Sequence, residues 1–419
     1  MQLPYDVVLF DLDGTLTLSH PGIVACARHA LTTLGVDIGD TDLKLFVGPP
    51  LYESFRSFGL SDDQVREGIR AFRAKYDVEG WSNAQVFPGI PSLLRTLKAR
   101  GVFLGVVTAK PAIQTERTLH GFGLQKYFDR VVSAGVTDDH VDKAEMIRRA
   151  LPEKYRKACM VGDRRFDMAG AEGAGLDGVG AMYGYGTHEE LTGSGATHLV
   201  EGVEALTELL LPGIPPERGP FLTLEGSDGC GKSTQARLLA EDLRRRGHRV
   251  VETREPGGCP ISEKIRSLVL DVKQQGMCDL TEALLFAASR AQHVREVIRP
   301  ALERGDTVVC SRFVDSSIAY QGIARGLGRE LVAKLNEAAV EGLKPDVTLL
   351  LMMDPLEAIR RRRRDSAPDR LEGDDDFARR ACDAFRILAE AEPGRIRTVD
   401  AGGSVEQIAA QIRQIVAEF

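Results

Sequence analysis

The stretch Glu225-Gly226-Ser227-Asp228-Gly229-Cys230-Gly231-Lys232-Ser233-Thr234 decides how the rest of the chain is interpreted. The apolar run Phe221-Leu222-Thr223-Leu224 precedes it, and Leu238, Leu239 and Leu243 follow at helical spacing. This context predicts a strand, a glycine-rich turn and a helix. Glycines let a backbone wrap closely around phosphates, and a helix N-terminus offers N–H groups and the positive end of its dipole. The context therefore favours a phosphate-binding loop over an incidental glycine-rich turn.

The pattern of this loop, G-x-x-x-x-G-K-S, resembles that of P-loop nucleoside triphosphatases. The resemblance implies an ATP site in which Lys232 reaches the β and γ phosphates and Ser233 ligates Mg²⁺. Cys230 is interpreted as a small residue that fills the loop rather than as a redox switch. The predicted ATP-binding residues are Gly226, Ser227, Asp228, Gly229, Cys230, Gly231, Lys232, Ser233 and Thr234.

Length and composition restrict the class of protein. The chain has 419 residues, of which 43% are hydrophobic and 27% charged, enough for two domains that each bury a core. The net charge of −7 argues against a general nucleic-acid binder, and no apolar run is long enough to span a membrane. The seven cysteines form no C-x-x-C pair, and the start lacks the basic region of a signal peptide. These features predict a cytoplasmic protein with reduced thiols.

A proline-rich segment separates two halves that carry different motifs. Residues 211–220 have the sequence Leu-Pro-Gly-Ile-Pro-Pro-Glu-Arg-Gly-Pro, which cannot continue a helix. We therefore predict one domain over residues 1–211, a linker over 212–220 and a second domain over 221–419.

In the first half, two acidic residues follow a predicted buried strand. Val7-Val8-Leu9-Phe10 is that strand, and Asp11-Leu12-Asp13-Gly14-Thr15 follows it. Two carboxylates at a strand end can enter one pocket, where one attacks a phosphoryl group while the other moves protons. The alternative is an Asx-rich turn, which is common after strands.

Polar residues near the ends of later strands favour the pocket over the turn. Thr108 follows a predicted strand over residues 102–107, and Asp163 follows another over 159–162. Lys143 precedes an amphipathic segment, and Asp167 comes shortly after Asp163. The carboxyl ends of parallel strands are where open α/β sheets bind ligands.

These four motifs, in this order, resemble those of the haloacid dehalogenase superfamily of phosphohydrolases over roughly residues 1–210. The resemblance implies a Rossmann-like three-layer α/β domain. Asp11 would be the nucleophile that forms an aspartyl-phosphate, Asp13 the general acid/base, and Thr108 and Lys143 would hold the phosphoryl group. The implied Mg²⁺ ligands are Asp11, Asp163 and the backbone carbonyl of Asp13, with Asp167 in support.

Residues 17–86 have mainly helical patterning and are predicted to form a helical cap inserted after the first strand. Two flanking segments, Gly48-Pro49-Pro50-Leu51 and Phe87-Pro88-Gly89-Ile90, are similar to the phosphoglycolate-phosphatase and 5′-nucleotidase-like branch. This likeness implies a small phosphate ester or a nucleotide as substrate, without identifying which.

The second half carries further motifs. A predicted helix from Thr281 to about Arg299 places Phe286 and Arg290 on one face, where a ring and a guanidinium can stack on a base and hydrogen-bond its edge. The alternative is a core phenylalanine beside a surface arginine. The other motifs are Arg254-Glu255-Pro256-Gly257-Gly258, the stretch from Ser311-Arg312 to Ser317-Ile318-Ala319-Tyr320-Gln321-Gly322, the arginine run from Arg360 to Arg364, and Asp369-Arg370-Leu371-Glu372.

Together these motifs resemble thymidylate kinase across residues 221–419. The resemblance implies a P-loop nucleoside monophosphate kinase fold with a parallel five-stranded sheet, and transfer of the γ-phosphoryl group of MgATP to dTMP. Arg312 would bind the dTMP phosphate, Phe286 would stack on thymine and Arg290 would contact the base. The implied dTMP-binding residues are Asp228, Glu255, Phe286, Arg290, Arg312, Ser317, Tyr320 and Gln321.

The resemblance also concerns the catalytic cations. One branch of the family has an arginine in the phosphate-binding loop at the place of Gly229, so the arginines here must come from the lid, as in the bacterial arrangement. This assigns catalytic roles to Arg364 and Arg370 beside Lys232 and Arg312. A solvated helix face or a nucleic-acid patch is the alternative for the arginine run.

Ser311 departs from the family pattern, which has an aspartate there that helps to hold Mg²⁺. We therefore expect weaker Mg²⁺ binding in this half. The leading interpretation is a bifunctional enzyme with Mg²⁺ in both domains, ATP and dTMP as kinase substrates, and a homodimer implied by the family. In the alternatives, one half is a catalytically silent nucleotide-binding or regulatory module, or the kinase uses another nucleoside monophosphate.

Overall fold

The computed structural model describes residues 2–47, 51–135, 142–365, 370 and 375–417. By its internal contacts the chain divides into two compact units, Met1–Ile214 with Arg245–His248, and Pro215–Arg244 with Arg249–Phe419. The predicted segment Gly48-Pro49-Pro50 and the motif residues Asp369, Leu371 and Glu372 lie outside the described residues. None of the described helices combines the length and the apolar character needed to cross a membrane.

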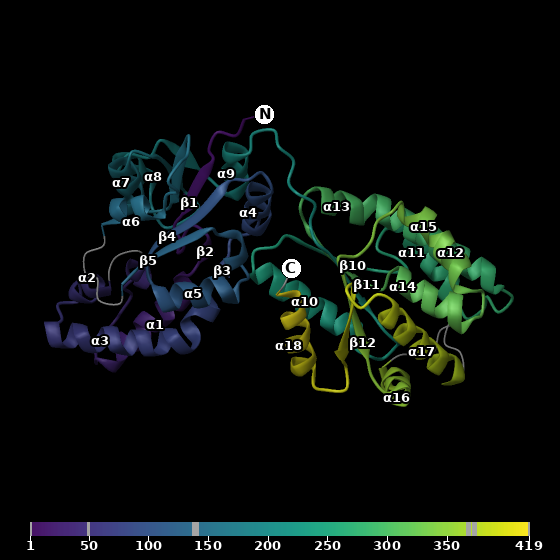
Figure 1. Ribbon diagram of the computed structural model, residues 1–419. Coiled ribbons are helices and arrows are strands. Elements are labelled where there is room, and N and C mark those ends of the chain that lie inside the picture. Colours follow the sequence, from purple (N-terminus) through teal and green to yellow (C-terminus); the bar gives the residue numbers. More distant parts are fainter. Residues whose placement is uncertain (1, 48–50, 136–141, 366–369, 371–374, 418–419) are drawn as a thin grey trace. The chain divides into compact units, whose positions relative to one another are not determined.

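A six-stranded parallel sheet forms the centre of the first unit (Figure 1). Its strand order, β5-β4-β1-β6-β7-β8, puts β1 between β4 and β6, so the residues that follow these three strands meet at one edge. The strands are β1 (Val7–Phe10), β4 (Phe103–Pro111), β5 (Arg130–Ala134), β6 (Ala158–Gly162), β7 (Asp177–Ala181) and β8 (His198–Val200).

Helices cover both faces of this sheet, because its central strands are apolar on both sides. Val8 and Phe10 of β1 pack in a cluster with residues of α4 (Ile90–Ala99), α5 (Ala112–Gly121) and α9 (Val203–Leu210). Val7 and Leu9 face the other way, toward α6 (Lys143–Ala150) and α7 (Arg165–Ala174). The predicted three-layer α/β architecture is confirmed. The short elements η4 (Gln125–Tyr127) and α8 (His188–Gly193) complete this part.

A helical segment with its own apolar core is inserted after β1. It begins and ends with an antiparallel pair, β2 (Thr17–Leu18) and β3 (Gln85–Val86). Cys26, Leu31 and Phe55 belong to its core. Ser61 and Gln64 form a capping box that starts the helix Asp62–Lys75. Its helices are α1 (His20–Thr33), η1 (Leu43–Phe46), α2 (Leu51–Arg56), α3 (Asp62–Lys75), η2 (Tyr76–Gly80) and η3 (Trp81–Asn83). The predicted helical cap is therefore present.

The second unit is built on a five-stranded parallel sheet, as predicted. Its strand order is β10-β11-β9-β12-β13. Its central strand β9 leads directly into the phosphate-binding loop. The strands are β9 (Phe221–Glu225), β10 (Val250–Arg254), β11 (Thr307–Ser311), β12 (Val347–Met352) and β13 (Ile396–Asp400).

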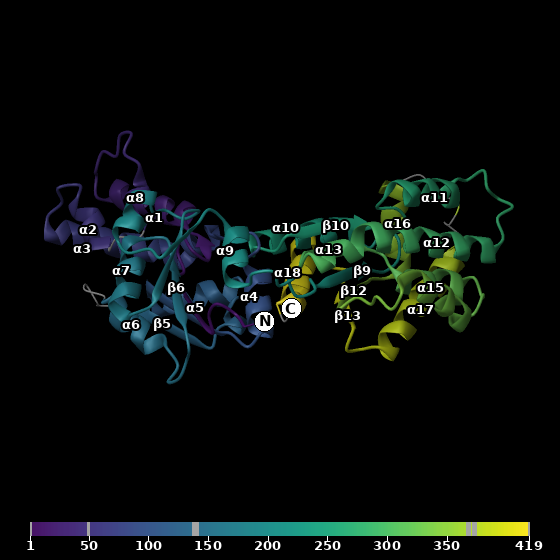
Figure 2. The same cartoon turned by 90° about the horizontal axis from the view of Figure 1, so that it is seen from above.

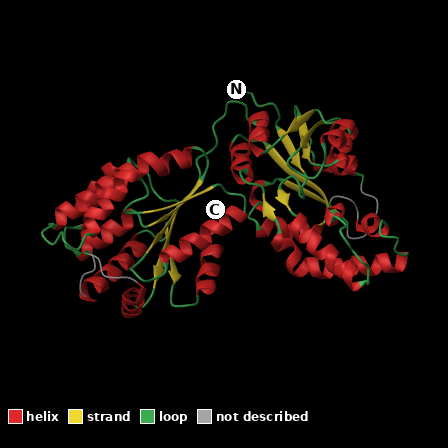
Figure 3. Ribbon diagram, turned by 180° about the vertical axis from the view of Figure 1, so that it is seen from behind, coloured by secondary structure: helices red, strands yellow, loops and turns green. Residues whose placement is uncertain are grey.

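Helices lie on both sides of this sheet (Figures 2 and 3). Alternate residues of β9 point to these two helical layers. Leu222 and Leu224 pack with α10 (Lys232–Arg245) and α18 (Val405–Val416). Phe221 packs with η5 (Val294–Ile298), α13 (Arg299–Glu303) and α15 (Arg329–Val340). The remaining helices are α11 (Pro260–Leu270), α12 (Asp279–His293), α14 (Val314–Ser317), η6 (Ile318–Ala324), α16 (Pro355–Asp365) and α17 (Asp375–Ala391). The helix expected from Thr281 to about Arg299 corresponds to α12 and η5.

Candidate active sites

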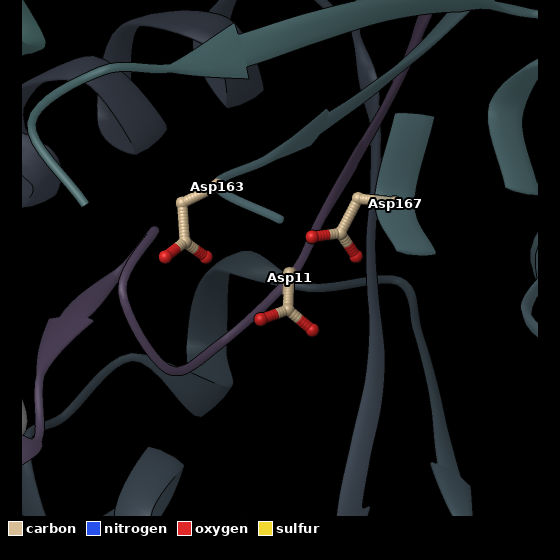
Figure 4. A group of neighbouring side chains, drawn as sticks. All are labelled: Asp11, Asp163 and Asp167. Carbon is tan, nitrogen blue, oxygen red and sulfur yellow. The ribbon is translucent and has the colours of Figure 1, made fainter. Parts of the chain in front are cut away.

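Three carboxylates meet at the edge of the first sheet (Figure 4). Asp11 follows β1, Asp163 follows β6, and Asp167 lies in the first turn of α7. One oxygen from each lies within 4.8 Å of the others. Oxygen ligands from buried carboxylates are what Mg²⁺ requires, and like charges this close favour a cation between them. The group therefore fits a divalent metal ion.

Lys143 joins two of these acids. Its Nζ lies 2.8 Å from Asp11 Oδ1 and 2.7 Å from Asp167 Oδ1. Burial raises the pKa of Asp11 to about 7, with Lys143 opposing the shift and Asp167 adding to it. Burial lowers the pKa of Lys143, but Asp11 and Asp167 together raise it by more. The net shift of the pKa is upward, so the ammonium stays charged. A nucleophile candidate and a fixed positive charge are thus in direct contact.

Asp163 is held by the loop after β1 and by Tyr185. Its Oδ2 accepts a hydrogen bond from the Tyr185 backbone N–H at 2.8 Å, and its Oδ1 accepts one from Thr15 Oγ1 at 3.3 Å. Burial, followed by Asp167 and Asp11, raises its pKa well above the usual range. Gly14 has φ +88°, and a Cβ there would lie 2.2 Å from Asp163 Oδ2. Only glycine allows this approach.

Asp13 does not belong to the group of three carboxylates and forms an ion pair with Lys110. The Lys110 Nζ is 2.9 Å from Asp13 Oδ1 and 2.7 Å from Oδ2. It also lies 5.0 Å from the ring centre of Tyr76, a residue of the helical cap. Thr108 is buried nearby, and its Oγ1 accepts a hydrogen bond from the Lys110 backbone N–H at 3.2 Å. The cap and the predicted general acid/base therefore share one lysine.

In the second unit, the phosphate-binding loop depends on glycine at close approaches. Gly226 has φ +135°, and a Cβ there would lie 2.4 Å from the Leu351 carbonyl oxygen. At Gly229, with φ +84°, a Cβ would lie 2.2 Å from the carbonyl oxygen of Ala358 in α16. A side chain at this place in the loop would therefore collide with α16.

The N-terminus of α10 carries the polar residues of the loop. Lys232 is its first residue, and Ser233 and Thr234 continue the first turn. The Lys232 ammonium folds back over the loop, 2.6 Å from the Ser227 carbonyl oxygen and 3.7 Å from Cys230 Sγ. Lys232 is buried, so water screens its positive charge only weakly. The charge therefore acts strongly on the space that the loop encloses.

Arg312 connects this loop to the neighbouring strand β11. Its guanidinium lies 2.6 Å from Asp228 Oδ1 and 2.9 Å from Ser316 Oγ, and it stacks on Tyr320 at 5.2 Å. Its backbone has φ +72°, a strained conformation for a residue with a side chain. Although burial opposes the shift, Arg312 and Lys232 hold the pKa of Asp228 below its usual range. Asp228 of the loop and Arg312 therefore form one charged unit.

A pocket beside Arg312 brings together all eight residues that the resemblance implied for the acceptor nucleotide. The pocket is lined by Asp228, Glu255, Pro256, Arg266, Leu270, Glu282, Phe286, Arg290, Arg312, Ser316, Ser317, Tyr320, Gln321 and Phe377.

Arg290 lines this pocket and is almost fully buried. Its Nε donates to Glu255 Oε2 at 2.6 Å, and its other nitrogens donate to Ser317 Oγ, the Asn336 side chain and the Phe313 carbonyl. His293 Nδ1 contacts the other oxygen of Glu255 at 3.0 Å. Most of the N–H groups of Arg290 thus bind neighbouring protein groups and hold the pocket wall in place.

Glu282 closes another side of the pocket. Its Oε1 accepts from Gln321 Nε2 at 2.9 Å, and its Oε2 lies 3.3 Å from Arg325 and 2.8 Å from Arg370. Arg370, which the resemblance placed among the catalytic cations, therefore lies against the pocket wall and donates its Nε to the Val269 carbonyl.

The arginine run lies on α16, which packs over the phosphate-binding loop. Arg362 lines a second hollow together with Ser227, Asp228 and Cys382. Arg364 is exposed and is not among the residues of that hollow. Among the arginines of α16 whose side chains the structure describes, Arg362 is therefore the one that lines the hollow beside the loop.

Two acids near Ser311 are already bound to protein donors. Glu225 accepts from the Phe313 N–H at 2.7 Å and from Ser316 Oγ at 2.5 Å. Asp315 is held by Arg395 at 2.7 and 2.8 Å. Glu225 thus holds the turn after β11, and Asp315 joins the same segment to Arg395.

The two halves match two different families. Residues 224–412 match the family model described as thymidylate kinase. In this region the chain is 48% identical over 199 residues to the thymidylate kinase of Symbiobacterium thermophilum, covering 47% of this chain and 92% of that protein. It is 49% identical over 204 residues to that of Rhizorhabdus wittichii, covering 48% and 98%. The chain belongs to the thymidylate kinase family.

Residues 8–181 match the family model described as haloacid dehalogenase-like hydrolase. Among solved structures, a putative phosphatase from Clostridium difficile is 33% identical, with a TM-score of 0.46, covering 49% of this chain and 99% of that one. A thymidylate kinase from Ehrlichia chaffeensis is also 33% identical, with a TM-score of 0.39 and coverages of 48% and 99%. The predicted fusion of a phosphatase with a thymidylate kinase is confirmed.

The thymidylate kinase half also contains pocket residues that sequence reasoning missed. Glu282 lies four residues before Phe286 and eight before Arg290, so helical spacing could have placed it on the same face. Arg362 could not be distinguished from its four arginine neighbours by sequence. In the phosphatase half, sequence reasoning did not identify Lys110, because its partner Asp13 is 97 residues away.

Proposed function

We propose that residues 221–419 transfer the γ-phosphoryl group of MgATP to dTMP, giving dTDP, and that residues 1–211 hydrolyse a phosphate monoester. The observation that carries the kinase proposal is the charged unit of Asp228 and Arg312, which joins the phosphate-binding loop to the acceptor pocket. A donor phosphate in the loop and an acceptor phosphate on Arg312 would therefore face each other. This is the alignment that phosphoryl transfer requires.

In this kinase mechanism the protein supplies alignment and positive charge. Lys232 and the loop N–H groups would hold the β and γ phosphates, and Ser233 would ligate Mg²⁺. Arginines of α16 and of the residues after it would neutralise charge on the transferring group, and family resemblance assigns this role to Arg364 and Arg370. Phe286 and Arg290 would hold the base within the pocket.

In the phosphatase half, Asp11 would attack the phosphorus atom and form an aspartyl-phosphate, while Asp13 gives a proton to the leaving alcohol. Water would then attack the phosphorus atom and lose a proton to Asp13, which releases inorganic phosphate and restores Asp11. Thr108 and Lys143 would hold the phosphoryl oxygens. Asp11, Asp163 and the Asp13 carbonyl would hold Mg²⁺, with Asp167 in support, and the ion would offset the negative charge of the phosphoryl group.

The two activities need different substrates. A dTMP phosphatase would hydrolyse the dTMP that the kinase in the same chain needs as its acceptor. We therefore infer that the phosphatase half prefers another small phosphate ester or nucleotide.

ADP release from MgATP, measured with each nucleoside monophosphate in turn, tests the kinase proposal. Asp11→Asn protein is used, so that the phosphatase half does not consume nucleotides. We expect dTMP to be the preferred acceptor. Preference for another monophosphate would overturn the substrate assignment, and dTMP binding without turnover would make the kinase half a nucleotide-binding module.

A further inference from the structure

Glu282 is a buried carboxylate in the wall of the acceptor pocket, with an exposed fraction of 1%. It contacts two guanidinium groups, 3.3 Å to Arg325 and 2.8 Å to Arg370, and one amide, 2.9 Å to Gln321 Nε2. A carboxylate paired with two arginines accepts hydrogen bonds and donates none. Every group around Glu282 must therefore present a donor to it.

This requirement fixes the orientation of the Gln321 amide. An amide has an NH₂ donor on one side and an oxygen acceptor on the other. Because the NH₂ group of Gln321 must face Glu282, its oxygen Oε1 is directed away from Glu282. Among the described residues, none donates to this oxygen, and Gln321 lines the pocket. The pocket thus gains one hydrogen-bond acceptor of defined position.

Arg290 supplies a donor in the same pocket. A guanidinium has five N–H groups, and those of Arg290 bind Glu255, Ser317, Asn336 and the Phe313 carbonyl. One N–H of its second terminal nitrogen has no acceptor among the described residues. The pocket therefore offers a donor from Arg290 and an acceptor from Gln321.

A base edge with a carbonyl beside an N–H complements this pair. Thymine and uracil have that edge, with the O4 carbonyl next to N3–H. Cytosine reverses both groups, since its N3 is an acceptor and its N4 amino group is a donor. We propose that Glu282 sets the base preference of the pocket by fixing the orientation of the Gln321 amide. This inference rests on the proposed kinase function and names the residue that makes it selective.

Glu282→Gln is the direct test, because the two arginines would hold the new amide by its oxygen and turn its NH₂ toward Gln321. Gln321 would then accept from it and present its own NH₂ to the base. The substrates compared are dTMP and 5-methyl-dCMP, which differ only at the edge in question. We expect kcat/KM for dTMP to fall about tenfold and that for 5-methyl-dCMP to rise. An equal fall for both substrates would show a merely structural role and overturn the proposal.

Gln321→Met provides a second test that leaves Glu282 in place. It removes the amide at similar volume, so the preference for dTMP over 5-methyl-dCMP should fall about tenfold. Adding Glu282→Gln to this variant should not change the preference further, because the residue acts through Gln321. An unchanged preference in Gln321→Met, or a further change in the double variant, would contradict the proposal.

Asp315→Asn is the matched control. Asp315 is also a buried carboxylate bound by an arginine, but it does not line the pocket. Any loss of kinase activity in Asp315→Asn protein should be equal for dTMP and 5-methyl-dCMP. If the wild-type protein phosphorylates neither nucleotide, the proposed kinase function fails, and the ratio of the two dissociation constants then decides the role of Glu282.

Discussion

The two halves of the chain place an acid and a cation in contact at the same position of two parallel sheets. In the phosphatase half, Asp11 follows the central strand β1 and lies 2.8 Å from Lys143. In the kinase half, Asp228 follows the central strand β9 and lies 2.6 Å from Arg312. The two ion pairs look alike, but their surroundings differ. Asp11 is grouped with two further carboxylates, whereas Asp228 lies between Arg312 and Lys232.

This difference separates two ways of moving a phosphoryl group. A buried carboxylate beside other carboxylates has its pKa raised, first by burial and then by the neighbouring negative charges. With a metal ion, such a carboxylate can attack phosphorus. A carboxylate between two cations is held as an anion whose role is to position them, so the substrate must provide the nucleophile. We therefore propose that the acid is the reactive group in the first site and positions the neighbouring cations in the second.

Replacing each acid by its amide tests this contrast and has the largest expected effect. Asp11→Asn should lower phosphatase turnover by at least about a thousandfold, because the nucleophile is lost. Asp228→Asn should lower kinase turnover roughly thirtyfold, because only one charge-assisted contact to Arg312 is weakened. Phosphate release from a panel of phosphate monoesters and ADP release with dTMP measure the two activities.

Asp37→Asn is the control and should leave both activities unchanged. Asp37 is an exposed acid of the helical cap, and among the described residues it bonds only the Gly39 N–H. Equal losses from Asp11→Asn and Asp228→Asn would contradict the assignment of different roles.

Sequence alone predicted those parts of the sites that depend on local order. Asp11 and Asp163 follow strands, and the phosphate-binding loop joins a strand to a helix, so their positions follow from chain direction. The partners of these residues were harder to predict. Arg370 contacts Glu282 across 88 residues, and Lys110 contacts Asp13 across 97. No periodicity relates such pairs, because tertiary packing brings them together.

The next largest effect is expected at Lys232, the buried ammonium of the phosphate-binding loop. Lys232→Met should reduce ADP release by roughly several hundredfold, because one positive charge next to the transferring group is lost. Phosphatase turnover should remain unchanged, since this lysine belongs to the other unit.

Lys273→Met, at an exposed lysine of the same unit, is the matched control and should retain full kinase activity. A parallel loss of both activities in Lys232→Met protein would show that the two sites are coupled.

Arg362 and Arg364 lie on the same helix but differ in their relation to the loop. Arg362 lines the hollow beside Ser227 and Asp228, whereas Arg364 is exposed. Arg362→Met should lower kcat for dTMP roughly thirtyfold if it neutralises the transferring group, and Arg364→Met should lower it less. The kcat of each variant at saturating ATP and dTMP measures this difference. A larger loss for Arg364 would favour the assignment made by family resemblance and show that α16 moves when both nucleotides are bound.

The smallest effect is expected at Ser311, where the family has an aspartate. Ser311 ends β11 directly before Arg312, and the neighbouring acids Glu225 and Asp315 are bound to protein donors. A neutral hydroxyl attracts a hydrated Mg²⁺ ion less than a carboxylate does. Ser311→Asp should therefore lower the Mg²⁺ concentration for half-maximal kinase activity about threefold, with little change of kcat at saturating Mg²⁺.

Titration of Mg²⁺ at fixed ATP and dTMP measures the shift, and Ser311→Asn, of similar size without charge, is the control. An unchanged Mg²⁺ requirement in Ser311→Asp protein would show that the kinase site holds its ion without an acid at this position, unlike the three-carboxylate site of the phosphatase half.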